Sequence, residues 1–224
     1  LLVIFSLGAC GGNPSKNGDG EVIFSVAIAG GYDTLNFFTT ESMMVYDWLN
    51  VAYDSLITYD EDYNAIPRVA KDWKEENNVW TFHLRDDVYF SDGEQLTSAD
   101  VKWTYEHAVD SYMYSLHASG FVSIECPDDF TVVFNCENAK PDMLYQILPI
   151  LPEHIWSGME DVLSYEPTEL VGSGPFIYSP ERSGSGSTAF VKNAEYWGDV
   201  PVIDVLVFTE YDNTDAIAQA LKLG

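Results

Sequence analysis

Histidine and cysteine are the residues of this sequence most able to bind a metal or to carry out covalent chemistry, and their spacing favours neither role. The four histidines, His83, His107, His117 and His154, include no pair three or four residues apart. No CxxC or HExxH pattern occurs, so the ligand spacings of common zinc sites are missing. No nucleophile–base signal is visible either. The sequence predicts no metal site, no cofactor and no catalytic residue.

Aromatic side chains are abundant, with 14 tyrosines and 6 tryptophans. Most aromatic residues fill protein cores. A minority line solute clefts, because binding pockets are apolar surfaces that carry a few placed polar groups. The composition is therefore compatible with a binding protein.

The charge of the chain restricts its partners. Lysine and arginine number 10 against 36 aspartates and glutamates, giving a formal net charge of −26. Nucleic acid and anionic lipid are both bound through basic surfaces, so neither is an expected partner. Two interpretations of the acidic excess remain: a soluble, self-repelling surface, and recruitment of cationic solutes. A hydrophobic content of 46% predicts a substantial core.

The clearest local signals lie between Trp80 and Tyr105. Trp80, Phe82 and Leu84 alternate with polar residues, as in a half-buried strand. The segment Ser91–Gly93 has turn chemistry, since glycine accepts a positive φ. These signals predict a strand followed by a turn.

A helix should begin directly after that turn. Thr97 and Asp100 form a shortened capping box, with aspartate in place of the usual glutamate or glutamine. Val101, Tyr105 and Ala108 then share one helical face. Taken alone, the stretch from Trp80 to Tyr105 predicts a piece of α/β scaffold and no catalytic site.

Two further segments predict strands of a common sheet. Glu21–Ala29 carries alternating apolar residues and ends at Gly30–Gly31. Val202–Phe208 is apolar apart from Asp204, which suits a sheet covered on both faces. Both are apolar enough to be central strands.

The segments Phe121–Cys126 and Phe130–Cys136 predict a hairpin with a three-residue turn. One inward face should hold Val122, Ile124 and Cys126 together with the apolar residues of the second strand.

Two cysteines of that hairpin are expected to remain free thiols. In the predicted register Cys136 lies opposite Gly120 and six residues of strand separate it from Cys126, roughly 20 Å at about 3.3 Å each. A disulfide requires Cα atoms within about 7 Å. Both thiols should be buried and act as small apolar side chains.

The stretch from Trp80 also carries a longer pattern: Trp80, Phe82, Leu84-Arg85, Phe90, Asp92-Gly93, Leu96-Thr97 and Asp100-Val101. Other segments with matching patterns are Tyr53-Asp54-Ser55-Leu56, Pro67–Trp73, Leu151–Ile155, Val171–Phe176 and Asn193–Asp204. Together they resemble the extracellular solute-binding proteins of family 5, the peptide and nickel receptors of ABC importers. The resemblance covers nearly all of Glu21–Gly224, although Leu35-Asn36-Phe37 lacks the proline that the family has there.

The resemblance implies an α/β, class II periplasmic-binding-protein fold, in which two lobes enclose the solute. Residues 21–57 and 168–224 resemble the first lobe, and residues 58–167 a subdomain inserted into it. The second lobe is expected beyond Gly224 and missing from this sequence. A first lobe alone is expected to bind no solute at physiological affinity.

The implied function is capture of an extracellular solute, preferably a di- or oligopeptide, and its delivery to ABC permease subunits. No bond is broken in such a process. Ala29, Gly30, Gly31 and Tyr32, at the end of the first strand, are the predicted solute contacts. Two alternatives stay open: the same receptor class with a metal chelate, haem or oligosaccharide as solute, and a surface hydrolase.

The first ten residues resemble the end of a bacterial lipoprotein signal peptide. The apolar run Leu1–Leu7 is too short to span a bilayer, and Leu7-Gly8-Ala9 precedes Cys10 as in a lipobox. Cys10 would carry the lipid and become the mature N-terminus. Residues 11–20 have the composition of a flexible tether. The predicted location is the outer face of the bacterial cytoplasmic membrane or the periplasm, with membrane contact through the lipid anchor only.

Overall fold

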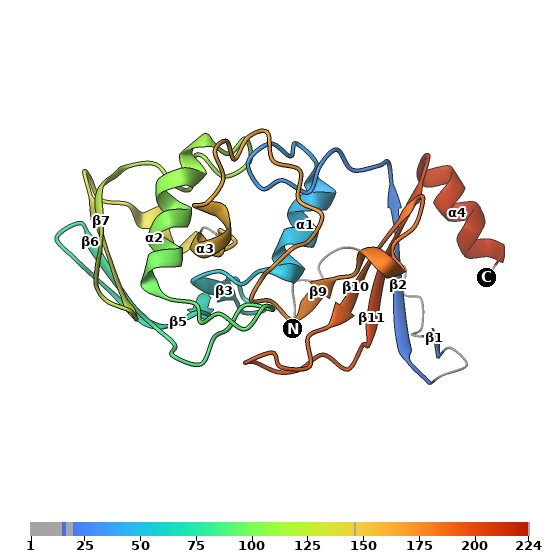
Figure 1. Ribbon diagram of the computed structural model, residues 1–224, viewed down its shortest axis with the longest axis horizontal. Coiled ribbons are helices and arrows are strands. Elements are labelled where there is room, and N and C mark those ends of the chain that lie inside the picture. The colour runs from blue at the N-terminus through green and yellow to red at the C-terminus, as the bar shows by residue number, and fades with distance from the viewer. Residues whose placement is uncertain (1–14, 17–19, 146, 224) are drawn as a thin grey trace.

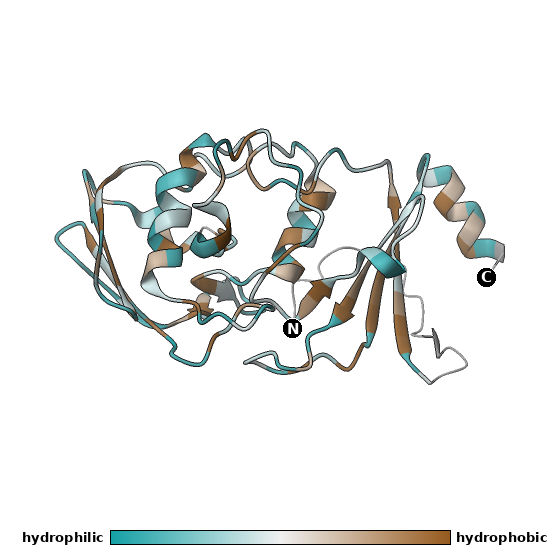
Figure 2. Cartoon of the chain, viewed as in Figure 1, coloured by the Kyte–Doolittle hydropathy of each residue, from teal (hydrophilic) through white to brown (hydrophobic). Residues whose placement is uncertain are grey.

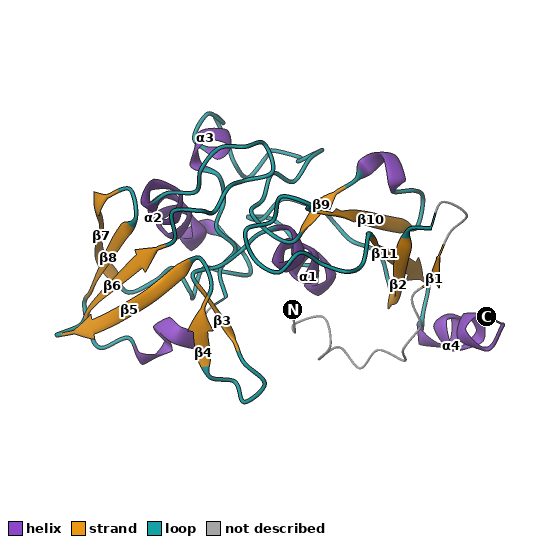
Figure 3. Ribbon diagram, turned by 90° about the horizontal axis from the view of Figure 1, so that it is seen from below, coloured by secondary structure: helices purple, strands orange, loops and turns teal. Residues whose placement is uncertain are grey.

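The computed structural model describes residues 15–16, 20–145 and 147–223. Within them the chain forms two α/β bodies, each built on its own main sheet (Figure 1). Helix α1, Met43–Ala52, lies between the two sheets in both ribbon views (Figures 1 and 3). Cys10 and most of the predicted tether fall outside the described residues.

The first body contains a five-stranded sheet in the order β1-β2-β11-β10-β9. Its strands are β1 Ser15–Lys16, β2 Val22–Ala29, β9 Phe176–Tyr178, β10 Ser187–Lys192 and β11 Val205–Tyr211. Strands β2 and β11 are parallel, whereas every other pair is antiparallel. The parallel pair confirms that the two apolar segments predicted as central strands share a sheet, and both are strongly hydrophobic in Figure 2. Helix α4, Thr214–Leu223, follows β11.

The second body contains an antiparallel four-stranded sheet in the order β5-β6-β8-β7. Its strands are β5 Ala70–Glu76, β6 Val79–Leu84, β7 Phe121–Asp128 and β8 Thr131–Cys136. Helix α2, Ser98–His107, packs on β7 and β8. A small sheet of β3 Ile57–Tyr59 and β4 Ala65–Pro67, the short helix α3 Glu153–Trp156, and 3₁₀ turns at Ala108–Asp110, Pro141–Tyr145 and Pro180–Arg182 complete the described elements.

The strand–turn–helix stretch has the predicted structure. Strand β6 alternates between partly exposed and buried residues, with Trp80, Phe82 and Leu84 buried. At the start of α2 the Thr97 hydroxyl accepts from the Ala99 amide, and Asp100 accepts from the Thr97 amide at 2.8 Å, which forms the shortened capping box. The inward helical face is buried as well.

The β7–β8 hairpin differs from its prediction. The strands extend to Asp128 and Thr131, and bulges interrupt the register next to Val122 and between Glu125 and Asp128. Val122 was predicted to face the core, but it is 71% exposed, because the bulge turns it outward. Cys136 pairs with Phe121 rather than with Gly120.

Both hairpin thiols are free, as predicted. Cys136 is buried, whereas Cys126 is only partly buried and its Sγ lies 3.2 Å from the Ser98 carbonyl oxygen. The prediction that both are buried is therefore wrong for Cys126.

Strand β11 begins at Val205, three residues later than predicted, and Val202 is 85% exposed. Asp204 explains the late start. Its carboxylate accepts from the Val22 amide at 2.8 Å and its own amide donates to the Val22 carbonyl, so this residue fixes the beginning of the β2–β11 pair.

Candidate functional site

The carboxyl ends of β2 and β11 form the candidate site. Because the two strands are parallel, their ends meet at one edge of the sheet, and ligands of open α/β sheets bind outside such ends. The pairing extends one residue past β2, where the Gly30 amide donates to the Tyr211 carbonyl at 2.8 Å. Figure 1 shows both strands ending on the side from which the chain crosses to α1.

The four predicted contact residues, Ala29 to Tyr32, all lie exposed at this edge. Gly30 has a φ of +99°, which a residue with a side chain adopts only with strain. Alternate residues of a strand direct their backbone groups to opposite edges. Since Gly30 bonds to β11, Ala29, the last residue of β2, directs its backbone groups away from β11. Among the described residues only β1 pairs on that outer edge, at Val22 and Ile23.

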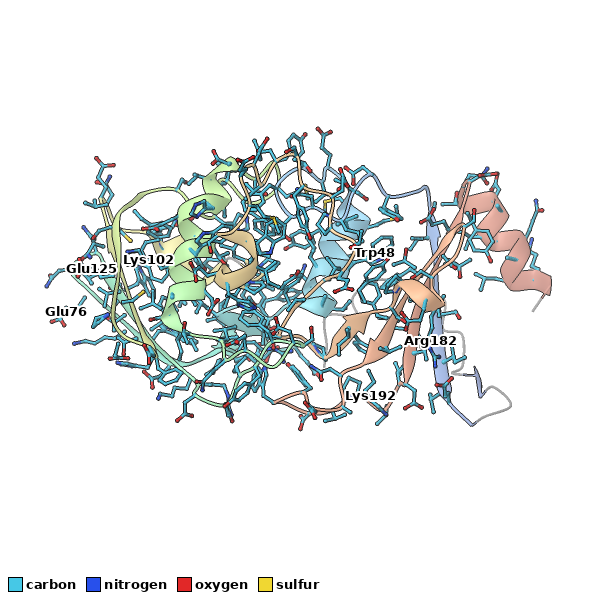
Figure 4. The ribbon with its side chains drawn as sticks, viewed as in Figure 1. Trp48, Glu76, Lys102, Glu125, Arg182 and Lys192 are labelled. Carbon is cyan, nitrogen blue, oxygen red and sulfur yellow. The ribbon has the colours of Figure 1, made fainter. Side chains whose placement is uncertain are left out.

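Tyr32 provides an aromatic surface beside these backbone groups. Its ring is 42% exposed and stands edge-on to the indole of Trp48, with centroids 5.0 Å apart. Trp48 is fully buried and packs on Phe190 and Phe208 of the sheet; it projects from α1 in Figure 4. The indole therefore supports Tyr32 from below. The Trp48 Nε1 atom is buried without a hydrogen-bond partner in the described part of the chain.

The loop after Tyr32 is held by two polar side chains. Asp33 accepts from the Thr34 and Glu41 amides and from the Thr40 hydroxyl. Partial burial opposes ionisation of Asp33, but these hydrogen bonds prevail and lower its pKa. Asn36, fully buried, donates to the carbonyls of Val162 and Tyr165 at 2.7 and 2.6 Å. Without the proline of the family pattern, the loop is fixed by side chains.

Glu210, near the end of β11, belongs to the same edge and was missed by the sequence reasoning. A Cβ atom on Gly31 would lie 3.3 Å from Glu210 Oε2, so the carboxylate packs against the glycine backbone. Burial, followed by the charges of Tyr178 and Glu210, raises the pKa of the Tyr32 hydroxyl. The sequence feature that could have identified Glu210 is an acidic residue at the end of an apolar segment.

The junction of the two bodies is built from four of the segments that carried the family resemblance. Asp54, with a side chain only 2% exposed, forms an ion pair with Arg68 Nε at 2.7 Å. The same carboxylate accepts from Trp197 Nε1 at 2.7 Å and from the Tyr196 hydroxyl at 3.3 Å. Arg68 and Arg85 lie over the Trp197 ring, 5.4 and 4.7 Å from its centroid. This cluster joins the two bodies.

The chain returns to the first body through Gly172-Ser173-Gly174. Close packing against the end of α1 explains why two of these three residues are glycine. A Cβ atom on Gly172 would lie 2.0 Å from the Ala52 carbonyl oxygen, and one on Gly174 would lie 2.6 Å from the Ala52 carbonyl carbon. The Gly174 amide donates to Ala52 at 2.9 Å, and the Asp54 amide donates to the Ser173 hydroxyl at 3.2 Å. The crossing requires glycine because it runs directly against the end of α1.

A cavity of about 100 Å³ lies between the end of α1 and α3. It is lined by Tyr53, Pro152, Ile155, Trp156, Tyr165, Glu169 and Val171. Sites for small molecules usually measure about 300–1,000 Å³, so this cavity is too small for a peptide. It contains none of the predicted contact residues.

The described residues contain neither a metal-binding cluster nor a membrane-spanning helix. Within residues 15–16, 20–145 and 147–223, no three His, Cys, Asp or Glu side chains cluster as metal ligands would. None of the helices in these ranges is long and apolar enough to cross a bilayer.

Solved structures of other proteins share this architecture. NikZ from Campylobacter jejuni, solved in complex with Ni(L-His), superposes with a TM-score of 0.78 at 20% identity, over 90% of this chain and 42% of NikZ. The oligopeptide-binding protein AppA from Bacillus subtilis, solved with a nonapeptide, gives a TM-score of 0.79 at 22% identity, over 94% of this chain and 43% of AppA. The fold is therefore the class II periplasmic-binding-protein fold.

The sequence identifies the family. A model of the bacterial extracellular solute-binding proteins, family 5 (middle region), matches residues 64–224. Protein XP55 of Streptomyces lividans is 32% identical over 183 residues, which cover 77% of this chain and 33% of XP55. The chain belongs to the family 5 extracellular solute-binding proteins, a family of binding proteins rather than enzymes. It spans about a third of this curated relative.

Proposed function

We propose that the protein is the solute-binding component of an ABC importer and that it captures di- or oligopeptides for delivery to the permease. The observation that carries the proposal is the outer edge of β2 at Ala29, with which no strand of the described residues pairs, next to the exposed Tyr32. An extended peptide can pair with such an edge through its main chain, while its side chains occupy neighbouring surfaces. The peptide bound in the AppA structure supports this choice of solute.

Capture would proceed by closure of two lobes around the solute, because contacts in both lobes stabilise the closed state over the open one. We propose residues 21–57 and 168–224 as part of the first lobe and residues 58–167 as its inserted subdomain. The sheets support this division: β2, β9, β10 and β11 come from the first set, and β5–β8 from the second. The Asp54 cluster joins the two parts.

A metal complex is the second candidate solute, since NikZ was solved with Ni(L-His). The edge of β2 favours the peptide, because its free backbone groups match the hydrogen-bonding pattern of a peptide main chain. In the described residues, no three His, Cys, Asp or Glu side chains gather at this edge as a metal site would require.

Peptide capture can be tested with the protein expressed from its complete coding sequence. Pools of tri- to pentapeptides should raise its melting temperature, since a ligand that binds only the native state stabilises it. Each peptide that binds should then be compared with versions N-methylated at successive amides. Strand pairing predicts that methylation weakens binding at alternate positions only.

Two tyrosine variants provide a matched control. Tyr32→Ala removes the aromatic surface at the proposed site and should lower peptide affinity. Tyr63→Ala removes a tyrosine that is 78% exposed in the β3–β4 turn, outside the site, and should leave affinity unchanged. Equal affinity of all three proteins, or stabilisation by metal complexes alone, would refute peptide capture at this edge.

A further inference from the structure

Glu210 is a partly buried carboxylate at the edge formed by the carboxyl ends of β2 and β11, and it has no role in the proposed main-chain pairing. Its Oε2 atom lies against the backbone of Gly31, and its strand position pairs with Ile28 of β2. Strand alternation places Glu210 on the same sheet face as Phe208, which contacts Trp48. The carboxylate therefore lies beside Ala29–Tyr32, on the side of the sheet where Tyr32 lies over Trp48.

No basic side chain of residues 20–145 or 147–223 forms an ion pair with Glu210. The basic residues of this sheet lie at its opposite end. Arg182 pairs with Glu21 just before β2, and Lys192 pairs with Asp204 just before β11. Both are labelled in Figure 4, away from the carboxyl ends of the strands. Carboxylates therefore dominate the site end of the sheet, where Asp33 and Glu210 both lie.

The neighbours of Glu210 suit a cation. A partly buried carboxylate attracts a positive charge more strongly than one in bulk water, because the surrounding dielectric constant is lower. The exposed ring of Tyr32 adds an aromatic face, to which ammonium and guanidinium groups are attracted. Exposed backbone carbonyls at the outer edge of β2 can accept further hydrogen bonds from such a group.

We propose that Glu210 binds a positively charged amine or guanidinium of the solute and makes the protein selective for cationic peptides. This inference rests on the proposed peptide function and names its substrate class. Glu210 is then a specificity-determining residue, and part of the acidic excess of the chain serves recruitment of cationic solutes. The charge can come from a lysine or arginine side chain or from the peptide N-terminus.

The test uses calorimetry on the protein expressed from its complete coding sequence. The titrants are Ala-Lys-Ala, its neutral analogue Ala-norleucine-Ala, and the N-acetylated form of each. Glu210→Gln should weaken binding of Ala-Lys-Ala about ten-fold or more, the usual effect of losing a charged hydrogen bond. It should leave acetyl-Ala-norleucine-Ala unchanged. If acetylation alone removes the effect, the group bound is the N-terminal ammonium; if the acetylated lysine peptide retains it, the group bound is the side chain.

Two controls keep the outcomes distinct. Glu41→Gln changes an exposed carboxylate of the neighbouring loop and should affect no peptide, and thermal melting checks the fold of both variants. Equal weakening of charged and neutral peptides by Glu210→Gln, or no weakening, would overturn the role of Glu210 while peptide capture stands. Titration with 1,5-diaminopentane covers the other case: Glu210-dependent binding of this diamine, without binding of any peptide, would refute peptide capture and retain the cation site. If neither the peptides nor the diamine bind, both peptide capture and the cation site are refuted.

Discussion

Asp54 and Trp197 lie 143 residues apart in the sequence, yet the indole Nε1 donates to the carboxylate at 2.7 Å. One residue follows helix α1, and the other lies between β10 and β11 of the first sheet. Arg68, between β4 and β5, completes the cluster from the other side. Three distant stretches thus converge on a single buried charge.

Arg68→Ala should destabilise the protein by about 3 kcal/mol or more, because it leaves the Asp54 charge buried without its cation. The variant also has a pH signature. Burial already raises the pKa of Asp54 in the folded protein, and Arg68 opposes that rise. Without Arg68 the folded-state pKa rises further, so the stability deficit of the variant is present at neutral pH and shrinks as the pH falls and the carboxyl becomes protonated. Urea unfolding at pH 7 and pH 4 measures both effects. Lys74→Ala breaks the exposed pair with Glu76 and should change nothing measurable.

Gly172→Ala and Gly174→Ala should each severely destabilise the chain, by several kcal/mol, since the added methyl would overlap the backbone of Ala52. The expected readout is a large fall in melting temperature or loss of soluble protein. Gly184→Ala is the matched control, because its methyl would lie 3.5 Å from the Ser187 hydroxyl, an ordinary contact. A wild-type melting temperature in either junction variant would contradict the crossing geometry.

Asp33→Asn tests the loop that presents Tyr32. Asp33 has a lowered pKa in the folded state, so its contribution is fully present above the ordinary value of 3.8 and is lost as the pH falls through the folded value. Wild type should be more stable than the variant at pH 6, and the difference should shrink as the pH is lowered below 3.8. Chemical denaturation at several pH values measures it. A difference that is independent of pH would show that the charge of Asp33 does not hold the loop.

The two hairpin thiols should differ in reactivity. Cys126 is partly exposed, whereas Cys136 is buried and burial raises its pKa, so less thiolate is available there. In a Cys10→Ser background, a thiol reagent should modify Cys126 first and Cys136 slowly, and both at once in urea. Addition of a reductant should leave the melting temperature unchanged. Faster modification of Cys136 would contradict the structure of β8.

Cys10 remains the predicted lipid attachment site. If it is lipidated, the protein should partition with membranes when the complete coding sequence is expressed in a bacterium, and Cys10→Ser should release it into the soluble fraction. Incorporation of a radiolabelled fatty acid provides a direct measurement. Wild-type protein found only in the soluble fraction would exclude the anchor.

Local patterns were read correctly where neighbouring residues determine the structure. The cap at Thr97 and the alternation in β6 depend on contacts within a few residues, so both were predicted. The outward position of Val122 was not, because a bulge depends on pairing with β8 and has no local signature. The common sheet of β2 and β11 was expected because both segments are apolar, but their direct parallel pairing was not predicted.

The candidate site was predicted in part for the same reason. Ala29–Tyr32 could be proposed from the end of a strand followed by two glycines. Glu210 could not, because its proximity to Gly31 arises from the register of two strands that lie far apart in the sequence. Asp54 likewise carried no sign of its partners Arg68 and Trp197, which only the folded chain brings together.

The hydrogen bonds at the junction have a consequence for protein engineering. The outgoing chain at Ala52–Asp54 and the returning chain at Ser173–Gly174 are bonded to each other at 2.9 and 3.2 Å. The segment between them therefore begins and ends at almost the same point in space. Residues 55–172 could therefore be exchanged for the corresponding segment of a relative, provided that the replacement supplies a cation to Asp54 and backbone carbonyls to Asn36.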